Sequence, residues 1–277
     1  MYDSQACRCD MKFVRILAIA LLAVVVIVAL VPGWWAANPY DTQFRATPDA
    51  PPSSGFLLGT DALGRDRWSR LIYGTRVSLL LAPAAALLSC LAAGILGGLA
   101  GLAGGFVDRV VLAAADLFLS LPWLFLLLMV RACLPLNVSP AASVGITFLL
   151  LGMLGWAAPA RVVRAAVRTL KSSEFVFVAR ARGCRPWRLL WRQLLPNVAP
   201  ILLAQFWVAV PVYILTETTL GMLGLGVAEP LPSWGGLLRE LEGSYLLTQP
   251  YLLAPAILLA MVIGSFQLLL PSEDFRA

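Results

Sequence analysis

Six long apolar runs dominate this chain of 277 residues and limit what it can fold into. Each run is close to the roughly 20 residues that a helix needs to cross the hydrocarbon core of a bilayer. Hydrophobic residues make up 60% of the chain and charged residues only 13%, which is typical of a polytopic membrane protein. The sequence therefore predicts an all-α polytopic membrane protein with six transmembrane helices, over residues 13–32, 77–102, 109–130, 141–160, 198–220 and 251–270.

The positive charge of the chain is concentrated between the fourth and fifth runs. Residues 161–192 hold eight arginines and one lysine against a single acid, Glu174. Because cytoplasmic loops carry an excess of Lys and Arg, this segment is predicted to be cytoplasmic. Counting the runs outward places both termini in the cytoplasm, and residues 33–76 and 221–250 outside.

The N-terminal segment resembles a signal peptide, because Lys12 and Arg15 precede an apolar stretch that ends near Trp35-Ala-Ala. This stretch is longer than the apolar part of a signal peptide, however, and five further runs follow, so we expect a retained membrane anchor. We therefore divide the chain into an N-terminal transmembrane helix with an external linker (1–55) and a core of five transmembrane helices (56–277).

Several kinds of chemistry are excluded by what the sequence lacks. Without histidine the chain has no Ser-His or Cys-His dyad and no H-E-x-x-H zinc motif. A P-loop needs a lysine directly after a glycine, and neither Lys12 nor Lys171 has that neighbour. Cys7 and Cys9 are spaced like metal ligands, but we expect them to be ordinary thiols. The sequence predicts no catalytic residue, metal site, cofactor or nucleic-acid partner for this chain.

Glycines recur every four residues near the end of the second run, as in Gly97 and Gly101. This spacing lets a second helix approach closely. Packing within the chain is the first expectation, and contact with a second subunit is the alternative.

Two acids fall within apolar runs, Asp116 and Glu217. A carboxylate is costly in lipid, so each should face the bundle interior or an aqueous path and have a partner. Both can line a translocation path or couple transport to protons, or they can belong to structural hydrogen-bond networks.

The segment 174–197 reads as two short amphipathic helices. Gly183 suits the end of the first helix and Pro186 the first turn of the second, which Pro196 is expected to end. The second helix is predicted to have one apolar face, formed by Trp187, Leu190, Trp191, Leu194 and Leu195. From pattern alone the segment can lie on anionic lipid or fit a groove on a partner protein.

In this segment, Gly183 followed by Leu194-Leu195-Pro196 resembles the EAA loop of ABC-importer permeases. Two further blocks are similar to the C-type permeases of dipeptide, oligopeptide and nickel importers. One runs from Gly59 to Leu79, and the other joins Leu223–Val227 to Pro232–Gly235. The resemblance extends over about residues 56–267.

The resemblance implies a subunit that forms half of a translocation path for small peptides, in the plasma (inner) membrane of a prokaryote. It implies a heterodimer with a second permease, two cytoplasmic ATPases that hold ATP and Mg, and an extracytoplasmic solute-binding protein. The EAA loop would be a cytoplasmic coupling helix between transmembrane helices 4 and 5, seated in the ATPase. Its residues here would be Glu174, Phe177, Ala179, Gly183, Pro186, Trp187, Leu190, Trp191, Leu194 and Pro196. Phe177 stands where the family has the acid of its Glu-Ala-Ala sequence.

Two further groups of candidate residues follow. For the translocation path or gate they are Asp116, Glu217, Gly224, Gly226 and Trp234. For external docking they are Asp61, Gly64, Arg65, Asp66 and Arg70. The alternative for this second group is an amphipathic interfacial segment held by an Asp66–Arg70 pair.

Two other functions compete with the importer. One is a stand-alone proton-coupled secondary transporter that uses Asp116 and Glu217, and the other is a membrane scaffold without transport.

Overall fold

The computed structural model describes residues 3–135, 138–243 and 249–270, with side chains from residue 13 onward except at residues 242 and 243. Cys7 and Cys9 therefore lie outside the described side chains. The described residues form helices joined by loops, with an isolated bridge between Thr60 and Asp66 and no β-strand. This confirms the all-α class.

Five helical segments are long and apolar enough to cross a membrane: Phe13–Leu30, Arg67–Ala103, Pro140–Leu170, Pro186–Met222 and Pro250–Leu269. The first lies within α1 (Asp3–Leu30), and the others contain α3 (Arg67–Ala103), α6 (Pro140–Leu154), α7 (Ala157–Leu170), α9 (Pro186–Leu189), α10 (Leu195–Met222) and α12 (Ala254–Leu269). The chain is thus a multi-pass membrane protein.

The third predicted run is not one straight helix. It forms α4 (Gly105–Ser120) and α5 (Trp123–Ala132), bent by 89° at Leu121–Pro122. Pro122 has no N–H to donate and forces Leu121 out of the helical region, to φ −92° and ψ 140°. The pair is either one broken span or a re-entrant loop, so the described residues contain five spans or six.

Pro196 does not end a helix, contrary to the sequence prediction. The chain stays helical from Pro186 to Met222, with a π-helical turn at Leu190–Leu194 between α9 and α10. The Leu195 N–H donates to the Leu190 carbonyl, five residues back. A wider π turn gives space just before a proline that cannot donate, so the helix continues.

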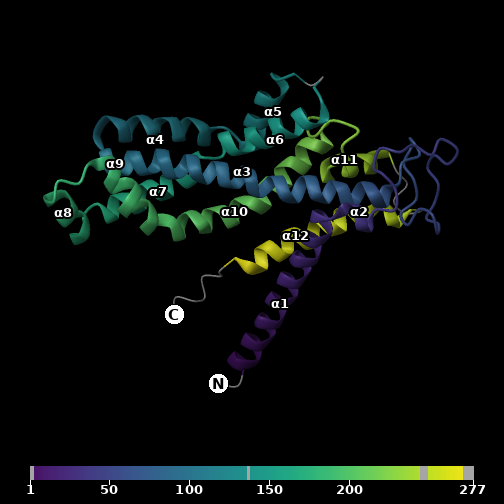
Figure 1. Ribbon diagram of the computed structural model, residues 1–277, viewed down its shortest axis with the longest axis horizontal. Helices are drawn as coiled ribbons and strands as arrows, with labels where there is room; N and C mark the ends of the chain where they lie inside the picture. The colour runs from purple at the N-terminus through teal and green to yellow at the C-terminus, as the bar shows by residue number, and fades with distance from the viewer. Residues whose placement is uncertain (1–2, 136–137, 244–248, 271–277) are drawn as a thin grey trace. The chain divides into compact units, whose positions relative to one another are not determined.

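By its contacts the chain divides into two compact units. Unit 1 contains residues 1–81, 136–145 and 214–277, and unit 2 contains residues 82–135 and 146–213. In unit 1, α1 packs along α12, and in unit 2, α4 packs along α7 (Figure 1). The proposed boundary at residue 55 stays a prediction.

The remaining elements are short. Unit 1 contains α2 (Pro32–Trp35), α11 (Trp234–Arg239) and the 3₁₀ turns Glu240–Gly243 and Pro250–Leu253, and unit 2 contains α8 (Glu174–Ala181).

The closely spaced glycines of α3 pack within unit 2. A Cβ on Gly101 would lie 2.9 Å from the Val167 side chain, and one on Gly98 would lie 3.0 Å from Leu190. Glycine is needed at these close approaches. Packing within the chain, the first expectation, is confirmed at these positions.

Candidate functional site

The segment from α8 to the π turn has one face buried in unit 2. Val176 and Ala179 of α8 pack together with Leu189, Leu190 and Leu194. They join residues of α3, α7 and α10 in one apolar cluster, namely Leu102, Val163, Val167 and Val198. Gly183 has φ +74°, which a glycine adopts without strain, and it ends α8 as predicted. The segment is thus fixed to the helices from which it projects.

The opposite face of this segment is aromatic and cationic. Phe177 is 75% exposed and Trp187 59% exposed, and Trp191 packs edge-on against Trp187. The exposed arginines of the same segment are Arg180, Arg182, Arg185, Arg188 and Arg192. We call Phe177, Trp187, Arg188, Trp191 and Arg192 the α8–α9 surface.

The apolar face predicted for the second helix is partly wrong. Leu190 and Leu194 are buried as expected, but the two tryptophans point outward and Leu189 is buried in their place. The π turn shifts the helical register at this point, so a simple 3.6-residue period does not hold. Glu174, also exposed, lines an open groove of about 570 Å³ with Val178 and Arg182.

The first four external candidates form a tight buried turn before α3. The backbone N–H groups of Leu63 and Arg65 donate to Asp61 Oδ1, at 2.9 and 2.8 Å, and Arg65 Nε donates to Asp61 Oδ2. Gly64 has φ +74°, and its carbonyl accepts from the Phe44 N–H. These side chains shape the loop from within and do not form an exposed surface.

Asp66 and Arg70 do not form the expected side-chain pair. Asp66 accepts from the Trp68 N–H at 3.1 Å and the Ser69 hydroxyl at 2.6 Å, so it caps the start of α3. Arg70 is fully buried and points elsewhere, to Glu229 at 3.0 Å and Glu240 at 3.3 Å. The expected Asp66–Arg70 pair is wrong, whereas an interfacial position of this segment stays a prediction.

The two glutamates around Arg70 have opposite pKa shifts. Burial acts to raise the pKa of Glu229, but hydrogen bonds and charge from Arg70 and Arg65 outweigh it and hold that pKa below the ordinary value. Burial is the main cause at Glu240 and raises its pKa, against the opposing charge of Arg70. Burial acts to lower the pKa of Arg65, but hydrogen bonds and charge from Asp61 and Glu229 outweigh it and raise that pKa.

Glu217 is fully buried in unit 1 and holds a network that joins α3, α10 and α11. The Ser78 hydroxyl donates to Glu217 Oε2 at 2.9 Å, and the Trp234 N–H donates to Ser78 Oγ at 3.3 Å. The buried Trp234 indole N–H donates to Thr75 Oγ1 at 3.0 Å. Ser233 also lies beside the carboxylate, whose Oε1 has no well-formed hydrogen bond within the described residues.

Gly224 and Gly226, the glycine candidates for the gate, shape the turn between α10 and α11. Gly224 has φ +76°, and a Cβ there would lie 2.9 Å from Arg239. A Cβ on Gly226 would lie 2.6 Å from Gly221 Cα, and Gly221 also meets Gly235 backbone to backbone. Trp234 and these glycines are therefore packing residues of unit 1.

Asp116 has a partner but is not buried. It forms an ion pair with Arg161 of α7, and its side chain is 59% exposed. Arg164, one turn further along α7, forms a bidentate pair with Asp108 of α4. Two ion pairs thus join α4 and α7, and the one at Asp116 reaches the surface of unit 2.

Comparison with known proteins shows what kind of subunit carries these features. Residues 93–271, more than half of the chain, match the family described as binding-protein-dependent transport system inner membrane component. The chain belongs to this family. As a binding-protein-dependent permease it is a transport subunit of an ABC importer, not an enzyme, and it works with other components of such a system.

Several relatives of this permease are similar over most of their length. The oligopeptide transport system permease protein of Bacillus subtilis (strain 168) is 32% identical, over 79% of this chain and 70% of the relative. The dipeptide transport system permease protein of the same organism is 30% identical, over 90% of this chain and 76% of the relative. The nickel transport system permease protein of Escherichia coli (strain K12) is 33% identical, over 91% and 89%. They confirm the predicted subfamily and do not support a stand-alone secondary transporter.

Sequence reasoning missed several partners in the permease. Glu229 and Glu240 pair with Arg70 across 159 and 170 residues, and Asp108 pairs with Arg164 across 56. Rules based on local residue spacing cannot predict pairs that are so far apart in the sequence. The only signal was the arginines themselves, since a buried cation requires carboxylates nearby.

Proposed function

We propose that this permease forms one half of the membrane path of a peptide importer. The second half is a different permease, and an extracytoplasmic binding protein delivers the solute. Two cytoplasmic ATPases bind ATP and Mg, and both termini of this chain lie in the cytoplasm of a prokaryote. Support for peptides as the solute comes from relatives named as oligopeptide and dipeptide transport permeases.

The observation that carries the proposal is the α8–α9 surface. Phe177, Trp187 and Trp191 are large apolar side chains left exposed on a segment whose other face is fully packed. Exposed aromatic residues among arginines are typical of the central contacts of protein interfaces. The partner should therefore offer an apolar groove with an acidic rim, and we assign that groove to the ATPase.

The packing of the segment suggests how it couples ATP to transport. Val176, Leu189 and Leu194 tie the α8–α9 surface to α3, α7 and α10 through one close-packed cluster. A close-packed cluster transmits displacement because it does not deform continuously. When ATP closes the ATPase pair, a shift at Phe177 and Trp187 moves those helices together. Phe177 contributes by packing, in place of a charge.

Reconstitution of the whole complex tests this function. Liposomes with this permease, its sister permease, both ATPases and the binding protein should take up a dipeptide only with ATP and Mg inside the compartment that the ATPases face. The permease alone under an imposed proton gradient should take up none. Uptake by the permease alone, or ATP-driven uptake of Ni²⁺ but no dipeptide, would contradict the proposal.

A further inference from the structure

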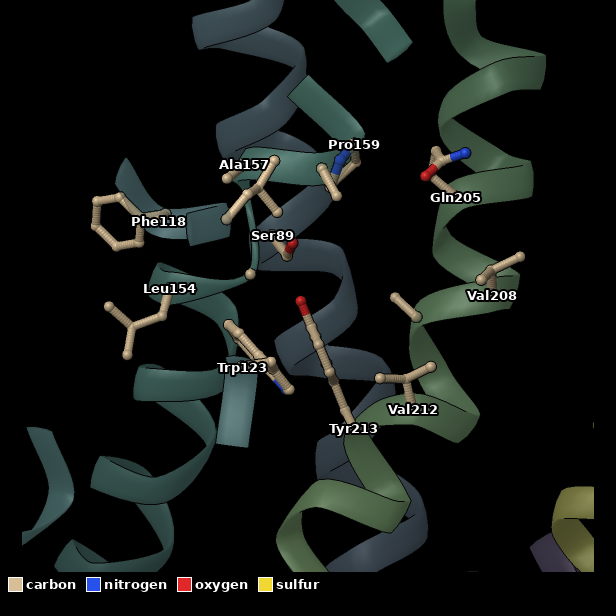
Figure 2. A pocket seen from close by; sticks show the side chains of 14 residues that line it. Ser89, Phe118, Trp123, Leu154, Ala157, Pro159, Gln205, Val208, Val212 and Tyr213 are labelled. Atoms are coloured by element: carbon tan, nitrogen blue, oxygen red, sulfur yellow. The ribbon is translucent and has the colours of Figure 1, made fainter. Parts of the chain in front are cut away.

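A pocket of about 260 Å³ lies among the apolar helices of unit 2 (Figure 2). Its residues come from α3, the α4–α5 break, the α6–α7 turn and α10. The rings of Trp123 and Tyr213 stack with centroids 6.3 Å apart and planes within 19°. The Tyr213 hydroxyl points toward Ser89, with which it shares a hydrogen bond. An aromatic platform therefore lines one wall of a mostly apolar pocket.

One polar group in this pocket argues against a lipid-facing site. Gln205 lines the pocket from within the apolar sequence of α10, and its side chain makes no hydrogen bond in the described part of the chain. An amide in hydrocarbon without a partner costs several kcal/mol. Water, or a polar solute, satisfies Gln205 if this side of α10 faces an aqueous path.

The ion pair between Asp116 and Arg161 points to the same conclusion. Asp116 precedes the pocket residue Phe118 by two positions, and Arg161 follows the pocket residue Pro159 by two. Their side chains are 59% and 45% exposed, and Arg161 is the first residue of the arginine-rich segment that is predicted to be cytoplasmic. Charged side chains at the cytoplasmic end of a membrane helix reach water. The pocket thus opens beside a surface that must be wet.

The size of the pocket limits its occupant. Drug-sized ligands occupy sites of about 300–1,000 Å³, so a pocket of about 260 Å³ suits one side chain better than a whole peptide. The bent α4–α5 pair places it at a broken helix, where transporters commonly bind solute. We propose that it takes one apolar or aromatic side chain of the transported peptide, over the Trp123–Tyr213 platform. This inference rests on the proposed function, because it takes a peptide as the solute.

A filled pocket tests the inference. Ala209 lines the pocket, and Ala204 is an exposed residue of the same helix outside it. In reconstituted complexes, Ala209→Phe should lower uptake of Ala-Phe and Ala-Trp at least about tenfold relative to Ala-Ala, because a filled pocket excludes large side chains. Uptake of Ala-Ala shows that the variant is folded. Ala204→Phe should keep the wild-type ratios.

Equal slowing of all these dipeptides by Ala209→Phe, or no slowing, would overturn the inference while leaving peptide transport intact. Loss of all dipeptide uptake by the wild-type complex would contradict the proposed function instead. A second variant, Ala209→Cys in a chain whose native cysteines are replaced by alanine, then tests whether the pocket is open to water. A membrane-impermeant thiol reagent should label Cys at 209 in the assembled complex. Absence of labelling with and without ATP shows a pocket closed to water and rejects the inference.

Discussion

The Arg70 guanidinium donates to the Glu229 carboxylate at 3.0 Å, although 159 residues separate them in the sequence. Arg70 is fully buried, and it also meets Glu240 at 3.3 Å and Asp61 at 3.7 Å. The contact joins the start of α3 to the segments on both sides of α11. One arginine therefore holds together the part of unit 1 predicted to lie outside the membrane.

Replacing Arg70 tests how much this cluster stabilises the permease. Arg70→Gln removes the buried cation that Asp61, Glu229 and Glu240 share, leaves only Arg65 and Arg67 beside them, and should lower the free energy of unfolding by about 2 kcal/mol. The value is at the low end because Glu229 is more than half exposed. The midpoint of thermal unfolding in detergent measures it. Arg45→Gln, at an exposed arginine, is the control, and equal midpoints would show that the cluster contributes nothing.

Glu229 and Glu240 are expected to make the stability of the folded permease depend on pH in opposite directions. The pKa of Glu229 lies below its ordinary value of 4.5 in the folded state, so its contribution is present above pH 4.5 and lost as pH falls through the folded pKa. The pKa of Glu240 is raised above 4.5, so its contribution is present below pH 4.5 and lost as pH rises through the folded pKa. Glu229→Gln should flatten the loss of stability below pH 4.5, and Glu240→Gln should flatten the loss above it.

The midpoint of thermal unfolding, measured for Glu229→Gln, Glu240→Gln and wild type at pH values on both sides of 4.5, distinguishes these two predictions. The same change of slope in both variants, or none, would show that the arginines do not lower the pKa of Glu229 and that burial does not raise the pKa of Glu240.

Neighbouring glycines of α11 offer a matched test of close packing. A Cβ on Gly235 would lie 2.7 Å from Gly221 Cα, and the nearest heavy atom to one on Gly236 is Ser233 Oγ at 3.9 Å. Gly235→Ala should destabilise the protein by about 1–3 kcal/mol through overpacking. Gly236→Ala should be neutral or slightly stabilising. If both variants unfold at the wild-type temperature, the close approach of α10 and α11 is not present.

Two substitutions of Glu217 distinguish a structural role of this carboxylate from a role in proton coupling. Glu217 has no ion pair among the described residues and accepts from Ser78 inside a packed network. Glu217→Gln keeps an acceptor for Ser78, so ATP-driven uptake should stay within about twofold of wild type, whereas Glu217→Leu leaves the buried hydroxyl unpaired and should impair assembly. Full-length complex that assembles with Glu217→Gln but does not transport would point to a proton role.

Local rules predicted the elements of this permease well and their partners poorly. Apolar length located the spans, and Gly183 and Pro186 marked the turn between α8 and α9, because these signals act over a few residues. The break at Pro122 and the continuation through Pro196 depend on how the local backbone accommodates a missing N–H, by leaving the helical region at Leu121 and by a π turn before Pro196. The partners of Arg70 lie too far away in the sequence for any helical period to predict them. The regular helical period placed Trp187 and Trp191 on the buried face, because it did not include the π turn.

The central claim is that the α8–α9 surface docks on the ATPase, and co-purification tests it directly. Trp187→Asp with Trp191→Asp places two charges in the proposed apolar contact without touching the buried cluster. Trp34→Asp with Trp35→Asp, at two other exposed tryptophans, is the matched control. The first pair should reduce the ATPase recovered with tagged permease by at least about tenfold at equal membrane insertion, and the control pair should not. Unchanged recovery of the ATPase with Trp187→Asp and Trp191→Asp would contradict the account.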